Sequence, residues 1–293
     1  MGWRTVVVSS RVKLELRLNY LVIRGDVEKK VFLDEISVLI IENTAVSLTC
    51  SLLHALSERK VKIVFCDPKR LPYSELVPYH GSYDSCEMIR QQIAWTEEQK
   101  NLIWTEIVRE KILNQASLLD HYGLSESAYK LQEYASEVGI GDNSNREGHA
   151  AKVYFNALFG TSFGRGQEIK INAGLNYGYQ VILACISREI SANGFLLQLG
   201  IFHSNTFNSF NLASDLMEPF RPVVDDYVLK MNLDGDELDK DDKQHILRML
   251  ECNVVIDNER RTLLEAMKKY TRCALDAICS SDTSLLRFFR YEF

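Results

Sequence analysis

The sequence has little of what marks several protein classes. Its seven cysteines form no CxxC pair and follow no regular spacing, which indicates reduced thiols rather than a disulfide framework. No apolar run approaches the roughly 20 residues of a membrane-spanning helix. The opening "MGWRTVVVSS" lacks the basic-then-apolar layout of a signal peptide. We therefore expect a soluble, cytoplasmic protein without a membrane partner.

An overall excess of positive charge is also absent, because the net charge is -6. The distribution is uneven, however. Residues 1–80 carry 12 Lys/Arg and 9 Asp/Glu, and residues 146–222 carry 6 and 5, so the acidic excess lies in the other two segments. The first and third segments can therefore face a polyanion such as DNA.

The first eighty residues contain short β-branched stretches separated by turn residues. "VKLELRLNY" (12–20) alternates, with Val12, Leu14, Leu16, Leu18 and Tyr20 on one side, and this predicts a half-buried strand. "TVVVSS", "YLVIRGD", "KKVFLDE", "SVLIIEN" and "VKIVFCD" predict further strands. A helix is expected over "AVSLTCSLLHALSERK" (45–60), capped by Asn43 or Thr44. Residues 1–80 are thus predicted to form a small β-rich domain.

Prolines are scarce except at 68, 72 and 78, and this cluster marks a domain boundary. Beyond it the pattern is helical to the end, beginning with an uninterrupted stretch over residues 87–119. The prediction is an α+β protein of two domains. A small N-terminal β-rich domain (1–80) precedes a larger all-α domain (81–293).

The stretch "HSNTFNSFNLASDLMEPFRP" (203–222) contains two acids, Asp215 and Glu218, among apolar residues. Their spacing of three places both on one face of a helix. Carboxylates rarely enter apolar surroundings without a partner. That partner is an arginine (Arg221 or Arg188), a water cluster or a metal ion.

Two other positions could supply metal ligands. Glu147 falls in the first turn of a helix capped by Asn145 or Ser144, where the helix dipole alone favours an acid by about 0.3–1 kcal/mol. His203 ends the apolar stretch "GFLLQLGIFH" (194–203), where a lone histidine is usually a satisfied core residue. Two carboxylates and an imidazole together suit Mg²⁺ or Mn²⁺. The set contains no cysteine, which argues against structural zinc.

Four stretches carry a family resemblance: "REGHAAKVYFNALFG" (146–160), "INAGLNYGYQVILA" (171–184), "LGIFH" (199–203) and "FNLASDLMEPFRPVVD" (210–225). In this order and spacing they resemble the CRISPR-associated spacer-acquisition endonucleases, the Cas-one integrase family. "MGWRTVVV" and "FCDPKRLPYSELVPYHG" (65–81) look like the type II branch. The resemblance covers nearly the whole chain.

The resemblance implies a site and a reaction. Glu147, His203 and Glu218 would bind the divalent metal, and Asp215 would support them. The 3′-hydroxyl of a captured DNA would attack a phosphodiester at the edge of the CRISPR repeat, and would do so twice. Tyr177 would stack on or hydrogen-bond the DNA terminus, or else pack along its helix.

The resemblance also implies double-stranded DNA as partner, a homodimer formed through the N-terminal domain, the small Cas-two protein, and possibly other type II CRISPR proteins. Backbone contacts suit DNA that is captured without a required sequence. The candidate phosphate-binding residues are Arg59, Lys60, Lys69, Arg70, Arg146, Arg165 and Lys170. The residues leave open a nuclease that only hydrolyses DNA and a scaffold that binds DNA without catalysis.

Overall fold

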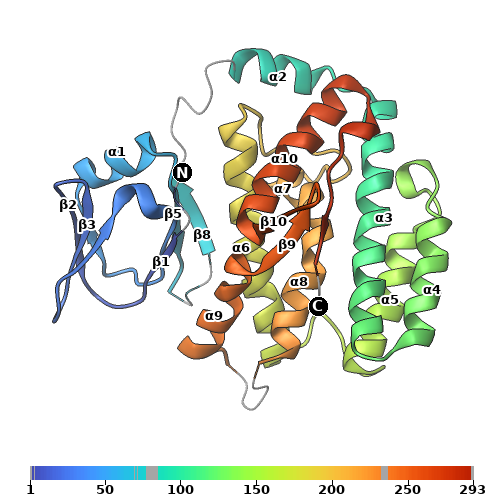
Figure 1. Cartoon of the computed structure of the whole chain (residues 1–293), viewed down its shortest axis with the longest axis horizontal. Helices are drawn as coiled ribbons and strands as arrows, with labels where there is room; N and C mark the ends of the chain where they lie inside the picture. The colour runs from blue at the N-terminus through green and yellow to red at the C-terminus, as the bar shows by residue number, and fades with distance from the viewer. Residues whose placement is uncertain are drawn as a thin grey trace. The chain divides into compact units, whose positions relative to one another are not determined.

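The computed structural model describes residues 2, 4–68, 70, 72–76, 85–231 and 237–291. The chain divides into two compact units, Met1–Tyr83 and Asp84–Phe293. The boundary predicted after residue 80 falls among residues 77–84, outside the described part. A β-rich first unit and a mostly helical second unit confirm the predicted α+β class (Figure 1).

The first unit contains a four-stranded sheet in the order β1-β5-β7-β8. Its strands are β1 (Arg4–Val8), β5 (Ile36–Ile41), β7 (Lys62–Cys66) and β8 (Pro72–Leu76). The first three are parallel, and β8 runs antiparallel to β7. Every residue of β5, "ISVLII", is buried, as expected for an inner strand of a parallel sheet.

A second sheet of the first unit has the order β4-β3-β2-β6. It comprises β2 (Lys13–Arg17), β3 (Tyr20–Arg24), β4 (Lys29–Phe32) and β6 (Ser47–Leu48). Helix α1 (Cys50–Glu58) follows, and its N-cap is Thr49 rather than Asn43 or Thr44. Leu14, Leu39 and Leu56, from the two sheets and the helix, are all fully buried in one core.

Two further details of the first unit differ from the prediction. Leu18 was expected to face inward, but it is 93% exposed. Strand β2 ends at Arg17, and Leu18 and Asn19 have φ of 44° and 64°, the left-handed pair typical of a tight hairpin turn. In addition, strand β8 lies inside the proline cluster that was taken only as a boundary.

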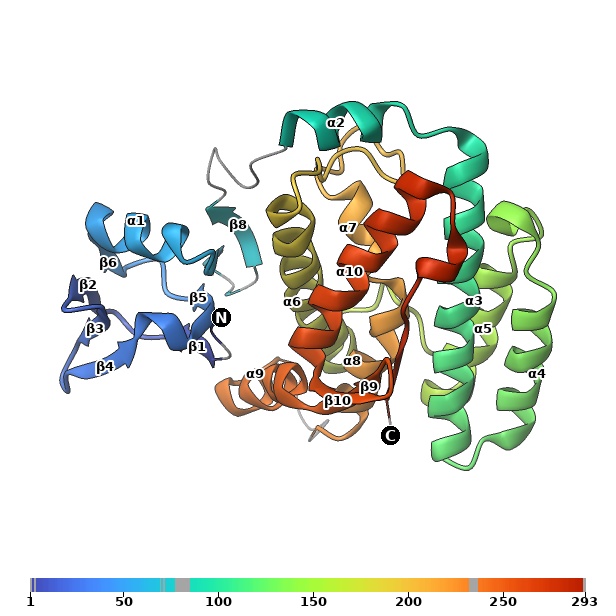
Figure 2. The same ribbon diagram turned by 45° about the horizontal axis from the view of Figure 1, so that its top comes forward.

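The second unit is built on long helices: α3 (Glu97–His121), α4 (Ser125–Ser136), α5 (Arg146–Phe159), α6 (Lys170–Ala192) and α10 (Leu263–Ser280). Figure 2 shows α3, α4 and α5 side by side. The uninterrupted helix predicted over 87–119 is wrong, because α2 (Ser85–Ile93) stops before α3 begins. A capping box causes the break: Gln99 N–H donates to Thr96 Oγ1, and Thr96 N–H donates to the Gln99 side chain.

Shorter elements complete this unit: α7 (Asn211–Leu216), the 3₁₀ turn η3 (Glu218–Phe220), α8 (Arg221–Leu229) and α9 (Lys240–Leu247). The unit is not purely helical as predicted. It also contains a small sheet of β9 (Asn253–Ile256), β10 (Glu259–Thr262) and β11 (Phe289–Arg290). Asp257 and Asn258, with φ of 51° and 62°, form the β9–β10 turn. No described helix is long and apolar enough to cross a membrane.

Helices α6 and α8 approach closely because α6 presents glycine at the contact. A Cβ on Gly178 would lie 2.3 Å from Val224 Cγ1, and one on Gly174 would lie 3.2 Å from Val228 Cγ2. Val224 is fully buried and branched, so it has little room to yield. The glycines therefore set the distance between α6, which follows the loop at 160–169, and α8, which follows the turn that begins at Glu218.

Gly178→Ala should lower the free energy of unfolding by about 1–3 kcal/mol through overpacking against Val224. Urea unfolding followed by the fluorescence of the buried Trp95 and Trp104 measures the change. The matched control is Gly166→Ala, because a Cβ there meets nothing within 4 Å. A Gly178→Ala protein as stable as the control would contradict this account of the helix contact.

Candidate functional site

Glu147 is held at the start of α5 by the turn that precedes it. Asn145, in the left-handed region, is the N-cap, and its side chain accepts from Gly148 N–H. The Asp142 carboxylate accepts the N–H groups of Arg146 and Glu147 at 2.8 and 3.0 Å. These contacts fix the first turn, so the Glu147 side chain leaves the helix in a defined direction.

Glu218 opens η3 and is 2% exposed. Its Oε1 accepts from Arg221 Nε at 2.8 Å, one of the two arginine partners left open by the sequence. The other candidate, Arg188, pairs with Glu189 instead. The other carboxylate oxygen of Glu218, Oε2, lies 2.5 Å from Lys111 Nζ, yet this buried oxygen accepts no well-directed hydrogen bond.

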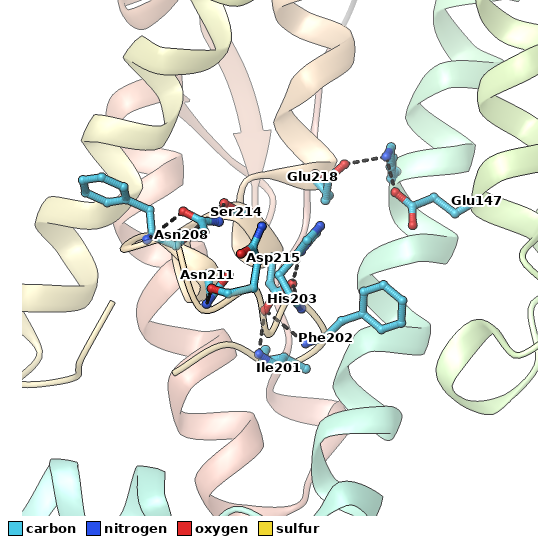
Figure 3. Close-up of polar contacts among 12 residues, drawn as sticks. Glu147, Ile201, Phe202, His203, Asn208, Asn211, Ser214, Asp215 and Glu218 are labelled. Atoms are coloured by element: carbon cyan, nitrogen blue, oxygen red, sulfur yellow. Dashed lines mark hydrogen bonds and ion pairs between the residues drawn. The ribbon is translucent and has the colours of Figure 1, made fainter. Parts of the chain in front are cut away.

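Lys111 comes from the buried face of α3 and was not anticipated. Its Nζ lies 2.5 Å from Glu147 Oε1 and 2.5 Å from Glu218 Oε2, so these oxygens are at most 5.0 Å apart. Figure 3 shows both carboxylates directed toward this one ammonium. The available signal was a lysine in register with Ile107, Val108 and Ile112 on an apolar stripe.

Asp215 organises the turn that contains His203. Its fully buried carboxylate accepts N–H groups from Ile201 (2.6 Å), Phe202 (3.1 Å) and His203 (3.0 Å), as drawn in Figure 3. The Nδ1 of His203 lies 2.6 Å from Asp215 Oδ1. A Cβ at Gly200 would lie 2.7 Å from Asp215 Oδ2, so the close approach requires glycine. This arrangement leaves the Nε2 of His203 available to a ligand.

The charges of the site shift its pKa values. Burial alone would raise the pKa of Glu218, but the positive charges of Arg221 and Lys111 lower it to about 2. Burial opposes the charge on Lys111, but Glu218 and Glu147 outweigh it and raise its pKa. The hydrogen bond to Asp215 raises the pKa of His203, and the charges of Glu218 and Glu147 add to this. Both glutamates thus act electrostatically on the ring.

The side chains of Glu147, His203 and Glu218 fit a divalent metal by their chemistry, although they do not converge on one point in this structure. No group of three His, Cys, Asp or Glu side chains that could hold a metal was found in the described part of the chain. Nevertheless, Glu218 has a buried oxygen without a directed hydrogen bond, and a second carboxylate lies at most 5.0 Å away. His203 presents an imidazole oriented by an acid. Oxygen-rich ligation with one imidazole suits Mg²⁺ or Mn²⁺.

A pocket of about 520 Å³ adjoins His203. Its lining is rich in amides and hydroxyls: Gln92, Gln198, Ser204, Asn205, Thr206, Asn208, Ser209 and Asn211. On the His203 turn, Phe202 stacks on Trp104 with ring centroids 4.5 Å apart and is still 52% exposed. The surroundings of His203 therefore offer both hydrogen-bonding groups and an exposed aromatic ring.

The predicted phosphate contacts of the first unit differ in their availability. Arg59 donates to Asp34 at 2.7 Å and to the Ala55 carbonyl at 3.0 Å, so it caps the end of α1. Lys60 and Arg70 are exposed, each with a positive φ. Lys69 lies outside the described residues.

In the helical unit, Arg146 pairs with Glu137 at 3.0 Å. Arg165 donates to Asn172 at 2.6 Å and to Asn176 at 2.7 Å, which ties the loop before α6 to that helix. Both arginines therefore have protein partners that a DNA phosphate would have to replace.

Two predicted DNA contacts are buried. Lys170 is 6% exposed and pairs with Asp242 at 2.8 Å, which corrects its expected place on the surface. Tyr177 is fully buried, with Lys243 Nζ 5.4 Å from its ring centroid. The alternative, packing along the helix, therefore describes Tyr177, and its ring is not presented to a DNA terminus in this structure.

Asp215→Asn should lower the pKa of His203, because the hydrogen bond to the carboxylate is the main cause of its elevation. NMR titration of the imidazole in EDTA measures the shift. A raised folded-state pKa stabilises the protein below pH 6.5, and this contribution is lost as the pH rises through the folded value. The variant should therefore show a smaller loss of stability over that range.

The matched control is Asp120→Asn, an exposed aspartate at the end of α3 whose carboxylate accepts from the Ser125 hydroxyl at 3.0 Å. It should leave the titration of His203 unchanged. Asp215→Asn should also lower the free energy of unfolding by about 1–3 kcal/mol, because a buried backbone N–H loses its acceptor. An unchanged pKa of His203 would refute the assigned contact.

The chain is similar to known proteins over most of its length. The family profile "CRISPR associated protein Cas1" matches residues 5–269. A relative from Neisseria meningitidis serogroup C (strain 8013), "CRISPR-associated endonuclease Cas1", is 38% identical over 273 residues, covering 92% of this chain and 90% of its own.

Two solved structures share the fold at 17% identity. "Casposase bound to integration product" has a TM-score of 0.77 and covers 97% of this chain and 92% of its own. "Cas6-RT-Cas1--Cas2 complex" has a TM-score of 0.74 over the whole chain, which spans 36% of that larger polypeptide. With 38% identity to a Cas1 endonuclease and a profile match over nearly its full length, the chain belongs to the CRISPR associated protein Cas1 family.

Proposed function

We propose that this protein is a divalent-metal-dependent DNA integrase that inserts captured DNA as new spacers into a CRISPR array in the cytoplasm. The 3′-hydroxyl of the captured fragment attacks a phosphodiester at the edge of the repeat. The family membership supports the class of the enzyme, and the names of the casposase and of the Neisseria relative point to integration and to an endonuclease. The type II branch is the one that the opening sequence resembles.

One observation carries the proposal: Glu147 and Glu218, from separate elements, direct their carboxylates at the same positive charge, the ammonium of Lys111. Burying the Glu218 carboxylate is costly unless a positive charge compensates it, and Glu147 is half-buried beside it. Glu147, His203 and Glu218 would hold Mg²⁺ or Mn²⁺. When bound, the ion would act as a Lewis acid on the scissile phosphate.

The other residues of the site position these groups. Asp215 fixes the ring of His203 and the turn that bears it. Arg221 occupies Oε1 of Glu218 and so restricts the rotation of that carboxylate. Holding donor groups in place before DNA binds reduces the reorganisation that the reaction requires.

The DNA would be bound mainly through its phosphates. Lys60 and Arg70 are exposed on the first unit, Arg146 begins α5 beside Glu147, and Arg165 lies in the loop before α6. Two chemical steps at a fixed spacing call for two active sites. A homodimer at each end of the small Cas-two protein, possibly with further type II proteins, supplies that geometry, and the name of a structural relative pairs Cas1 with Cas2.

The ion pairs of Glu218 with Lys111 and Arg221 favour a second candidate, a scaffold whose acids are structural. Replacing Glu218 discriminates between the two. Glu218→Gln removes a charge while keeping size and shape. The metal proposal predicts a folded protein without joining activity, and the scaffold predicts unchanged joining per folded molecule.

Glu218→Gln should lower DNA joining by more than the roughly 10–100-fold that the loss of an outer-shell partner costs a metal site. The protein and its Cas-two partner are mixed with short duplexes and a repeat-bearing plasmid. Covalent joining is scored in Mg²⁺, Mn²⁺ and EDTA. The matched control is Glu126→Gln, an acid in the first turn of α4.

Branched substrates separate integration from hydrolysis. When the half-integrated product is supplied, a hydroxyl nucleophile yields rejoined strands, whereas a water nucleophile yields only shorter ones. Cleavage without joined product, in the presence of both partner and metal, would assign the protein to hydrolytic nucleases. Joining that persists at wild-type rate in EDTA would reject the metal.

A further inference from the structure

Lys111 contributes a single ammonium to a place where two ligand carboxylates meet. The residue is 7% exposed on α3, and its Nζ contacts Glu147 of α5 and Glu218 of η3 at 2.5 Å each. One side chain thus links three segments that are far apart in the sequence. Lys111 lies outside the four sequence stretches that carry the family resemblance.

The geometry sets up a competition at one atom. Glu218 Oε1 already accepts from Arg221, so only Oε2 can serve a metal without breaking that pair. Oε2 is the atom that lies 2.5 Å from Lys111 Nζ. Metal–oxygen bonds to Mg²⁺ are about 2.0–2.1 Å, so an ion on Oε2 would lie close to the ammonium, and two like charges would share one buried carboxylate oxygen.

We propose that Lys111 is the resident counter-ion of the metal site. In the metal-free protein it holds Glu147 and Glu218 together, and a divalent cation must displace it to bind. Lys111 is a positioning residue that sets the affinity for the metal and keeps the site assembled without it. The inference rests on the proposed metal-dependent function and adds the identity of the group that the metal replaces.

The test removes the positive charge of Lys111 and keeps an unbranched side chain of similar length. Lys111→Met removes the competitor and leaves two carboxylates facing each other. It should bind Mn²⁺ at least about 10-fold more tightly than the wild type in calorimetry. Its melting temperature in EDTA should fall below that of the wild type, and saturating Mn²⁺ should recover most of the difference, because a bound cation stabilises the folded state by mass action.

Lys230→Met is the matched control. Lys230 also neutralises a fully buried carboxylate, Asp226, at 2.6 Å, but no proposed metal ligand lies in that pair. Its loss of melting temperature should be the same in EDTA and in Mn²⁺, and its Mn²⁺ affinity should equal that of the wild type.

Unchanged or weaker Mn²⁺ binding by folded Lys111→Met would overturn the inference, while the proposed function would stand as long as the wild type binds Mn²⁺. A wild type that binds no Mn²⁺ would overturn both. If the variant does not fold in either buffer, acylation of the wild type with an amine reagent decides. Lys111 should react faster in Mn²⁺ than in EDTA, and equal or slower reaction overturns the inference.

Discussion

The candidate site depends on two glutamates, one buried and one half-buried, that meet at one positive charge. Glu218 is almost inaccessible, and a buried carboxylate without a counter-charge is strongly destabilising. Lys111 and Arg221 supply that charge from two different helices, and Lys111 also pairs with Glu147. The positions of α3, α5, η3 and α8 are therefore coupled through a few atoms. A site built this way is sensitive to any cation that enters it.

A second buried acid, Asp225 of α8, connects that helix to α5 and α6. The Asp225 carboxylate accepts from Tyr154 and Tyr179 at 2.7 and 2.5 Å. Burial, only partly opposed by those hydrogen bonds and by Arg221, raises the pKa of Asp225 to about 6. The guanidinium of Arg221 lies 4.5 Å from the ring centroid of Tyr179 while it donates to Glu218. Arg221 thus joins a structural network between α5, α6 and α8 to the proposed metal ligands.

The sequence indicated the strands of the first unit, the family and the principal residues of the candidate site. Alternation over residues 12–20 and short β-branched stretches between turn residues indicated the strands of the first unit, because both are local patterns. The motif spacing pointed to Glu147, His203, Asp215 and Glu218, and the family is confirmed by comparison. The break before α3 was also legible as a Thr96-x-x-Gln capping box. It was missed because apolar periodicity continues through the gap.

What the sequence determined by itself is the class of fold, the family and the kinds of side chain available for chemistry. Only the tertiary structure decided which charges meet. Lys111 lies 36 residues from Glu147, and Tyr177 and Lys170 look in sequence like any exposed tyrosine and lysine on a helix. Whether a side chain faces solvent, a core or an opposite charge depends on the neighbours that packing brings to it. Those neighbours come from distant segments, which no local pattern encodes.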